Sequence, residues 1–252
     1  MRRLTPDPGE TTVEQQLDPY RPWEQSQDDR PFVAMNFAAT VDGRATIDGV
    51  SGPIGSSADT EMLSRLRTRF DAVMIGAGTM RAERYGRIVA DRGQREDRER
   101  LGLPPDPLMV LVSGRLDLPW EAPLFTAGRG RVLILTASEA EPPETATKLR
   151  IVRHEGRVDL AAALRHLREE HEVRALLCEG GPHLHGQLQA AGLVDELFLT
   201  IAPKLTGSDA PRIVEGLGTA LAEELELAWL LEQNGELFAR YRTWRVGRKM
   251  SD

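Results

Sequence analysis

The residues best suited to chemistry follow a short apolar stretch in the last third of the chain. Glu179 comes directly after residues 175–178 and is followed by Gly180, Gly181 and Pro182. Proline is favoured at the first position of a helix, so we predict a strand, a tight turn and a helix that begins at Pro182. Free N–H groups at a helix start suit a phosphate, and glycines let a ligand approach the backbone closely. A plain solvated turn is the alternative interpretation.

A second glycine turn, Gly76-Ala77-Gly78-Thr79, follows the apolar residues 71–75. A Rossmann fingerprint requires a further glycine where this chain has Arg81, so that motif is not complete. The turn can still present backbone N–H groups and the Thr79 hydroxyl to a cofactor phosphate, with a plain turn as the alternative.

The bulk composition limits the class of protein. The chain has 252 residues and a formal net charge of −7, which argues against a nucleic-acid partner. No stretch approaches 18 apolar residues, and the N-terminus lacks the apolar segment of a signal peptide, so we expect a cytoplasmic protein without a membrane partner. The single cysteine, Cys178, rules out an intrachain disulfide or a multi-cysteine metal site, and we predict no metal.

Alternating apolar segments indicate the elements that position these turns. Strands are expected at 31–40, 71–75, 108–113, 124–125, 132–136, 149–152, 175–178 and 195–202. Helices are expected from Ser56 or Ser57 to about Arg69, within 141–147, at 158–168 and from Pro182. In the first of these helices, Asp59 has capping-box-like spacing to Ser56.

The two ends of the chain differ from its centre. Residues 1–30 hold many prolines and polar side chains, and we expect an N-terminal arm laid over the body by Leu17, Tyr20 and Trp23. Asn234-Gly235 is a strong hairpin signal between strands expected at 225–232 and 236–246. The sheet is therefore expected to be mixed, with parallel strands followed by an antiparallel end.

Five motifs, in this order, resemble one family. They are residues 36–44, Ser51-Gly52, residues 71–79 with Glu83, residues 179–182, and residues 195–205 with Gly207-Ser208. Together they are similar to the reductase domain of riboflavin biosynthesis, the C-terminal half of the bifunctional deaminase-reductase. The resemblance covers about residues 31–246. It implies a dihydrofolate-reductase-like α/β fold: one three-layer domain over 31–252, with a mixed, mostly parallel sheet, helices on both faces and a C-terminal antiparallel hairpin.

The resemblance also implies roles for single residues. The cofactor-contacting positions are Ala38, Pro53, Thr79, Glu83, Gly180, Gly181 and Pro182. The substrate-contacting positions are Asn36, Ser51, Arg67 and Glu179. Arg67 would suit a substrate phosphate, and Glu179, beside the nicotinamide, is the candidate catalytic residue that orients a proton. Asn36 stands where the bifunctional enzymes often carry lysine.

Four further positions are less sharply assigned. Arg115 and Arg131 are equal candidates for contacting an adenosine 2′-phosphate. His183 and His185 lie one turn into the helix that begins at Pro182, where a role in the cleft competes with simple solvation.

We therefore expect an NADPH-dependent oxidoreductase that transfers a hydride to a ribosylamino-pyrimidine substrate. A deaminase half is not expected, because its zinc signature requires more cysteines than this chain has. The expected partners are a small-molecule substrate and a second copy of the chain. Two alternatives remain: a reductase of another heterocycle, such as dihydrofolate or a pterin, and an NADPH-binding protein without catalysis.

Overall fold

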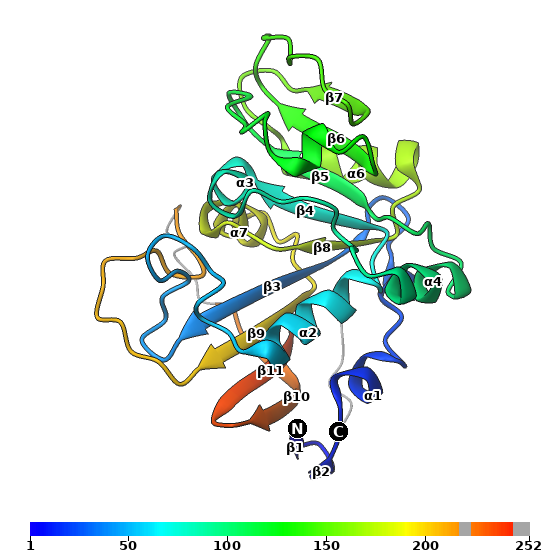
Figure 1. Ribbon diagram of the computed structural model, residues 1–252. Helices are drawn as coiled ribbons and strands as arrows, with labels where there is room; N and C mark the ends of the chain where they lie inside the picture. Colours follow the sequence, from blue (N-terminus) through cyan, green and yellow to red (C-terminus); the bar gives the residue numbers. More distant parts are fainter. Residues whose placement is uncertain (217–222, 244–252) are drawn as a thin grey trace.

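The computed structural model describes residues 1–216 and 223–243 (Figure 1). The helices in this part of the chain are α1 (Val13–Leu17), α2 (Ser57–Arg67), α3 (Ala77–Glu83), α4 (Arg92–Arg100), α5 (Pro123–Thr126), α6 (Leu160–His171) and α7 (Pro182–Ala190), with a 3-10 helix at Pro22–Gln25. The strands are β1 (Arg2–Thr5), β2 (Gly9–Glu10), β3 (Phe32–Thr40), β4 (Ala72–Gly76), β5 (Leu108–Val112), β6 (Arg131–Thr136), β7 (Leu149–Arg153), β8 (Ala175–Cys178), β9 (Glu196–Ala202), β10 (Leu225–Gln233) and β11 (Glu236–Thr243).

The described strands form one sheet in the order β2-β1-β10-β11-β9-β3-β8-β4-β5-β6-β7. From β9 through β3 to β7 every neighbouring pair is parallel, whereas β11, β10, β1 and β2 are added in antiparallel fashion. Parallel neighbours need long crossover connections, and the helices supply several of them. The predicted mixed, mostly parallel sheet with a C-terminal hairpin is therefore confirmed.

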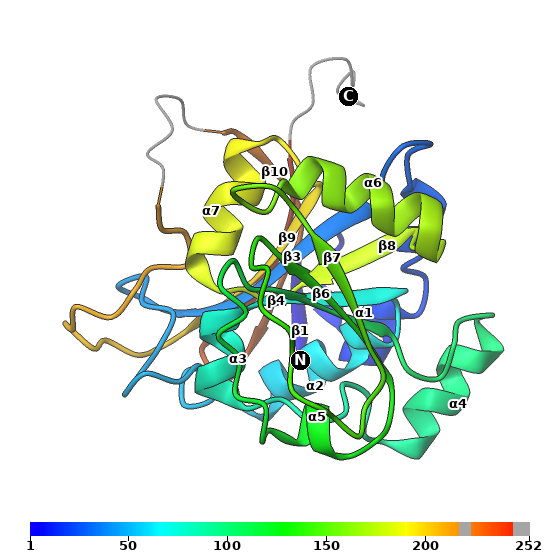
Figure 2. The ribbon, with the colours of Figure 1, turned by 90° about the horizontal axis from the view of Figure 1, so that it is seen from above.

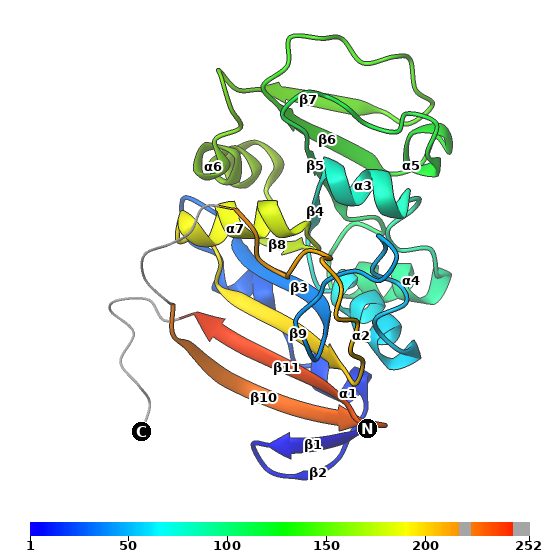
Figure 3. The same ribbon diagram turned by 90° about the vertical axis from the view of Figure 1, so that its left-hand side faces the viewer.

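Helices cover both faces of this sheet. Seen from above, α6 and α7 lie on one side and α2, α3 and α5 on the other (Figure 2). The view onto the carboxyl ends of the parallel strands shows the same three layers (Figure 3). Successive strand residues point to opposite faces. In β4, accordingly, Val73 and Ile75 pack in the core that contains α2, while Ala72 and Met74 pack in the core that contains α6 and α7.

Helix α2 illustrates how local signals fix an element. Its N-cap is Ser56, whose hydroxyl accepts from the backbone N–H of Ala58. Met62 and Leu66, four residues apart, are fully buried and face the sheet. Asp59 makes no capping box, because the second partner of Ser56 is Glu236 of β11, which accepts from the Ser56 backbone N–H at 3.1 Å.

The first 30 residues pack against the rest of the chain. β1 pairs with β10, and Val13, Leu17 and Tyr20 are buried in the core that contains α2. The Tyr20 hydroxyl donates to Glu196 at 2.8 Å, and Glu196 also receives two bonds from Arg240. The edge of the C-terminal hairpin is thus covered by the N-terminus of the same chain.

Two predicted elements are wrong, and one lies partly outside the described residues. Leu124 and Phe125, expected in a strand, belong to α5, because Pro123 occupies the first helical turn and Phe125 donates its N–H to Ala122. No helix forms within 141–147, where two prolines remove backbone donors and Thr145 bonds locally to the Thr147 carbonyl. Residues 244–246 of the expected last strand are not described.

None of the described helices is long and apolar enough to cross a bilayer. Among the same residues, no group of three or more His, Cys, Asp or Glu side chains is arranged to hold a metal ion. Cys178 is buried in β8, where burial raises the pKa of its thiol to about 12.

Candidate active site

A cavity of about 1060 Å³ lies at the carboxyl ends of the central parallel strands. Residues from β3 and from the segments that follow β4, β5 and β8 line it, together with the starts of α2, α3, α6 and α7. In an open α/β sheet, ligands bind beyond the carboxyl ends of the strands, which is where this cavity lies. Its volume is at the upper end of the range for small-molecule sites.

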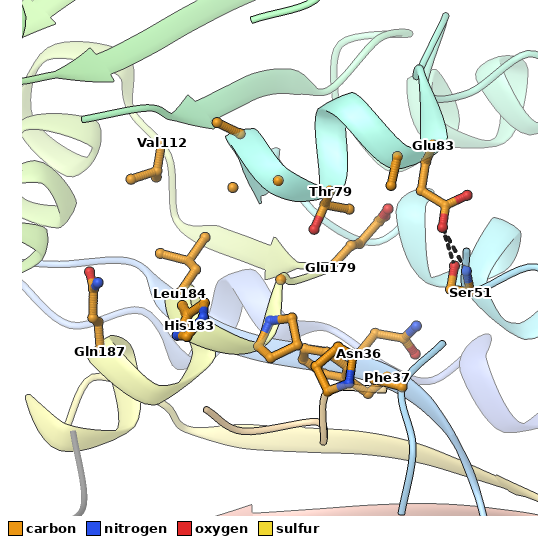
Figure 4. A pocket seen from close by; sticks show the side chains of 18 of the residues that line it. Asn36, Phe37, Ser51, Thr79, Glu83, Val112, Glu179, His183, Leu184 and Gln187 are labelled. Carbon is orange, nitrogen blue, oxygen red and sulfur yellow. Dashed lines mark hydrogen bonds between the residues drawn. The ribbon is translucent and has the colours of Figure 1, made fainter. Parts of the chain in front are cut away.

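The two glycine turns predicted to face a cofactor lie side by side in this cavity. β4 pairs with β8, so the turns that follow them meet, and Gly76 donates its N–H to the Gly180 carbonyl at 2.8 Å. Helix α7 starts at this point with Gly181 as N-cap and Pro182 in the first turn, as predicted. Its free N–H groups therefore face the cavity, into which Thr79 also projects (Figure 4).

Gly180 and Gly181, in the turn between β8 and α7, leave no room for side chains. Gly180 has a φ of +104°, and a Cβ atom there would lie 3.1 Å from the Phe37 ring. A Cβ atom at Gly181 would lie 2.9 Å from the Thr79 hydroxyl oxygen. The peptide bond between the two glycines is cis. Any side chain at either position would fill the cradle between β4 and α7, so the backbone itself forms this wall.

The predicted residues Ser51 and Glu83 contact each other across the mouth of the cavity (Figure 4). Both the backbone N–H and the hydroxyl of Ser51 donate to the same oxygen of Glu83, each at 2.8 Å. Pro53 is exposed and lies outside the cavity lining, but its carbonyl accepts from Lys204 at 2.6 Å. The loop between β3 and α2 is thus tied to α3 on one side and to the segment after β9 on the other.

Glu179, the predicted catalytic residue, lies at the floor of the cavity in a closed network. Arg67 of α2 donates from Nε to one carboxylate oxygen at 2.7 Å and from Nη2 to the other at 2.6 Å. The Tyr85 hydroxyl donates to Glu179 at 3.0 Å. The Glu179 side chain is only 3% exposed and that of Arg67 is 19% exposed.

The electrostatics of this network follow from burial and charge. Burial alone would lower the pKa of Arg67, but the adjacent Glu179 carboxylate reverses the effect and raises it. Burial, and then Glu179, raise the pKa of Tyr85 well above its usual value. Arg67 is therefore a permanent cation and Tyr85 a neutral donor. Of the three side chains, Glu179 and Tyr85 line the cavity, while Arg67 lies behind them.

Asn36 and Ala38 line the cavity from β3, as predicted site residues. The sequence prediction missed another lining residue, Asp59, which lies in the first turn of α2. Its spacing of three to Met62 and seven to Leu66 places it on the buried face of the helix, a signal that the capping-box interpretation overlooked. Burial raises the pKa of Asp59, Thr200 lowers it by a hydrogen bond, and Glu236 raises it.

The candidate arginines and histidines differ in whether they line the cavity. Arg115 lines the cavity beyond β5, and Arg157, which the sequence prediction missed, lines it ahead of α6. Arg131 begins β6 and so lies at the opposite end of the sheet. His183 lines the cavity, whereas His185 is buried, stacks on Phe37, and has its pKa lowered to about 4 by burial.

Comparisons with known proteins give one consistent result. Residues 31–232 match the model of the RibD C-terminal domain. The chain is 32% identical over 194 residues to the 2,5-diamino-6-ribosylamino-4(3H)-pyrimidinone 5′-phosphate reductase of Archaeoglobus fulgidus, an alignment that covers 74% of this chain and 87% of the relative.

Solved structures agree on the fold. A pyrimidine reductase-like protein from Corynebacterium diphtheriae superposes with a TM-score of 0.78 at 25% identity, covering 94% of this chain and 100% of the other. The diaminohydroxyphosphoribosylaminopyrimidine deaminase/5-amino-6-(5-phosphoribosylamino)uracil reductase of Thermotoga maritima superposes with a TM-score of 0.69 at 21% identity, over 85% of this chain and 57% of the other.

Proposed function

Because the chain belongs to the RibD C-terminal domain family, we propose that it reduces 2,5-diamino-6-ribosylamino-4(3H)-pyrimidinone 5′-phosphate, with NADPH as the hydride donor. The family match confirms the resemblance seen in the sequence and the class of oxidoreductase that it implied. The observation that carries the proposal is that the glycine turns and the polar side chains of Asn36, Asp59 and Glu179 line the same cavity. We assign the cofactor phosphates to the glycine-walled part and the substrate to the polar part.

The glycine-walled part fits a dinucleotide phosphate. The Gly180-Gly181-Pro182 turn supplies the start of α7, where N–H groups and the helix dipole favour an anion. Gly181 lines the cavity and carries no side chain, so a pyrophosphate can approach its backbone closely. In this proposal Ala38, Thr79 and the turn contact the cofactor, Glu83 closes the loop over it, and Pro53 lies at the rim.

The adenosine end of the cofactor would lie toward β5 and α6. Arg115 and Arg157 are the cations that line this part of the cavity, and both are exposed. Guanidinium groups bind phosphate through paired N–H donors, so these side chains are suited to the 2′-phosphate that distinguishes NADPH from NADH.

This assignment predicts a cofactor-specific defect. Replacing Arg115 or Arg157 by alanine should raise the KM for NADPH about 10-fold or more, because a charge-assisted contact contributes about 1.5–3 kcal/mol. The same variants should leave kcat/KM with NADH nearly unchanged. Arg131→Ala, at the other end of the sheet, is the matched control. Equal losses with NADPH and NADH would contradict the assignment.

The chemistry requires one hydride and one proton. Bound NADPH would supply the hydride that the sugar C1′ accepts as the C1′–O4′ bond opens, and the sugar oxygen takes up the proton. Glu179 holds Tyr85 and Arg67 in fixed orientations at the floor of the cavity, so the Tyr85 hydroxyl and the carboxylate present an ordered polar surface to the reacting sugar. Asn36 and Ser51 contact the substrate from β3 and from the closing loop, and Arg67 acts from behind Glu179.

The direct test is a substrate panel with purified protein and NADPH oxidation as the readout. Oxidation should occur with the diaminopyrimidinone ribosyl phosphate. Turnover of dihydrofolate or a dihydropterin alone would instead identify a reductase of another heterocycle. Tight NADPH binding without oxidation by any of these compounds would identify a binding protein without catalysis.

We also propose that the protein is a homodimer that works in the cytoplasm, where other pathway enzymes and NADPH are expected. The edge of β10 is paired with β1, so the C-terminal strands offer a face rather than an edge to a second copy. Leu225 and Leu227 on β10 are 39% and 40% exposed, which supplies apolar surface for such a contact.

Sedimentation velocity tests the dimer. The wild-type protein should sediment with twice the mass of one chain, and Leu227→Glu should sediment with the mass of one chain. A monomeric wild-type protein would refute the dimer.

A further inference from the structure

Asp59 is a carboxylate of the cavity lining that receives no bond from an arginine or a lysine among the described residues. It occupies the inward position of the first turn of α2, at the wall where the ends of β3 and β9 meet that helix. The neighbouring carboxylates are already bound: Glu179 receives bonds from Arg67 and Tyr85, and Glu236 receives bonds from Ser56. The Asp59 carboxylate interacts with Thr200 of β9.

The surroundings of Asp59 leave its charge without compensation from a cation. Among the described residues, the groups that act on it are Thr200 and the negative Glu236, together with burial itself. A partly desolvated carboxylate without enough donors is costly, and a ligand that brings N–H groups removes that cost. The site is therefore preformed for a ligand that donates hydrogen bonds.

Gly55 has no side chain, which leaves room for the Asp59 carboxylate. A Cβ atom at Gly55 would lie 2.1 Å from Oδ2 of Asp59. Lys204 holds the carbonyls of Pro53 and Ile54 just before this glycine, at 2.6 and 2.9 Å. The loop is thus fixed so that the Asp59 carboxylate lies against backbone on one side and faces the cavity on the other.

The two heterocycles named among the related proteins differ at C2 of the ring and in the hydrogen on N1, and the difference at C2 lies beside N3–H. The diaminopyrimidinone carries an amino group at C2 beside the N3–H, which places two N–H donors next to each other. The uracil carries a carbonyl at C2, which places an acceptor beside the N3–H. An ionised carboxylate only accepts hydrogen bonds, so it matches the first pattern and opposes the second.

We propose that Asp59 binds the 2-amino and N3–H groups of the substrate, an inference that rests on the proposed function. This contact makes the enzyme select the 2-aminopyrimidinone over the corresponding uracil. A site built to bind a substrate N–H rejects an analogue that lacks it, because the buried carboxylate would then face a carbonyl oxygen. The wild-type protein should therefore prefer the 2-amino substrate by about 100-fold or more in kcat/KM.

Asp59→Asn tests this with an isosteric change. Asparagine donates and accepts, so it matches the C2 carbonyl and N3–H of the uracil. The variant should lose about 100-fold in kcat/KM with the 2-amino substrate and gain with the uracil, reversing the preference. Gly55→Ala, which displaces the carboxylate, should also lose the preference. Glu61→Gln, an exposed change on the same helix, should keep the wild-type ratio.

A binding measurement separates this inference from the proposed function. Calorimetry in the presence of NADP⁺ compares 2,5,6-triaminopyrimidin-4-one with 5,6-diaminouracil, which differ at C2 and in the hydrogen on N1. Wild-type protein should bind the first more tightly, and Asp59→Asn should reverse the order, even if neither ribosyl phosphate is turned over. An equal loss of both affinities or both turnovers in Asp59→Asn, or a wild-type preference for the uracil, would overturn the role of Asp59.

Discussion

At the scale of single residues, the site depends on carboxylates in contrasting surroundings. Glu179 is closed in by Arg67 and Tyr85, whereas Asp59 faces the cavity with Thr200 as its donor. The Arg67 guanidinium also lies 5.5 Å from the centre of the Tyr85 ring, which adds a cation–π contact. Glu179 therefore organises the floor of the cavity, while Asp59 is suited to direct recognition.

Removing the charge of Glu179 should be costly. Glu179→Gln leaves the Arg67 cation without its carboxylate in a site where Glu179 is 3% exposed, so the free energy of unfolding should fall by about 3 kcal/mol. Urea denaturation measures this, and kcat should fall in the same variant. Replacing Arg67 by methionine as well should restore part of the stability, because no unpaired charge then remains.

The control for that change is Glu169→Gln, which alters an exposed glutamate on α6. It should shift the unfolding free energy by less than about 0.5 kcal/mol. If Glu179→Gln is as stable and as active as this control, the network does not organise the site.

At the scale of elements, the turn from β8 to α7 was the best predicted part of the molecule. Pro182 after two glycines is a local signal, because the conformation it favours depends on neighbouring residues and not on distant contacts. The role of Arg67 was harder to foresee, because its partner Glu179 is 112 positions away in the sequence. Asp59 was assigned to a cap because Ser56 lies three residues before it, but the partner that overrode this, Glu236, comes from β11.

The buried histidine of α7 gives a pH dependence. Burial lowers the pKa of His185 to about 4 in the folded protein, while an unfolded histidine titrates near its ordinary value of about 6.5. Above that value both states are neutral. As the pH falls below it, the unfolded state binds a proton that the folded state does not, so stability should fall by roughly 3 kcal/mol by about pH 4.

His185→Gln should lose this part of the pH dependence, as judged from urea denaturation between pH 7 and 4.5. His183→Gln, which changes the exposed histidine of the same helix, should keep the wild-type slope. Parallel loss of stability in the wild type and His185→Gln would show that His185 does not titrate as its burial implies.

At the scale of the whole molecule, one sheet joins the N-terminus, the centre and the C-terminal hairpin. The family resemblance and the alternating apolar segments predicted the layers and the parallel strands of the centre. They did not predict that β1 would pair with β10, because residues 1–30 are polar and rich in proline and carry no strand periodicity. The strand predicted at Leu124 and Phe125 was wrong because two adjacent apolar residues indicate burial but not the type of element. Pro123, in the first helical turn, favours a helix there.

This arrangement places a cavity at the carboxyl ends of the central strands, lined by the glycine turn and by the polar side chains of Asn36 and Asp59. In the proposed function, a hydride passes across this cavity to the sugar carbon of an aminopyrimidine ribosyl phosphate. The roles proposed for the cofactor-contacting residues and for Glu179 in catalysis depend on that transfer.

The most direct measurement uses NADPH carrying deuterium at both C4 positions of the nicotinamide, with the diaminopyrimidinone ribosyl phosphate as substrate. Mass spectrometry and NMR of the product should find one deuterium for each NADPH oxidised, located at C1′ of a ribityl chain. Oxidation without deuterium in the product, deuterium at another carbon, or no oxidation of NADPH would contradict the proposed reductase activity.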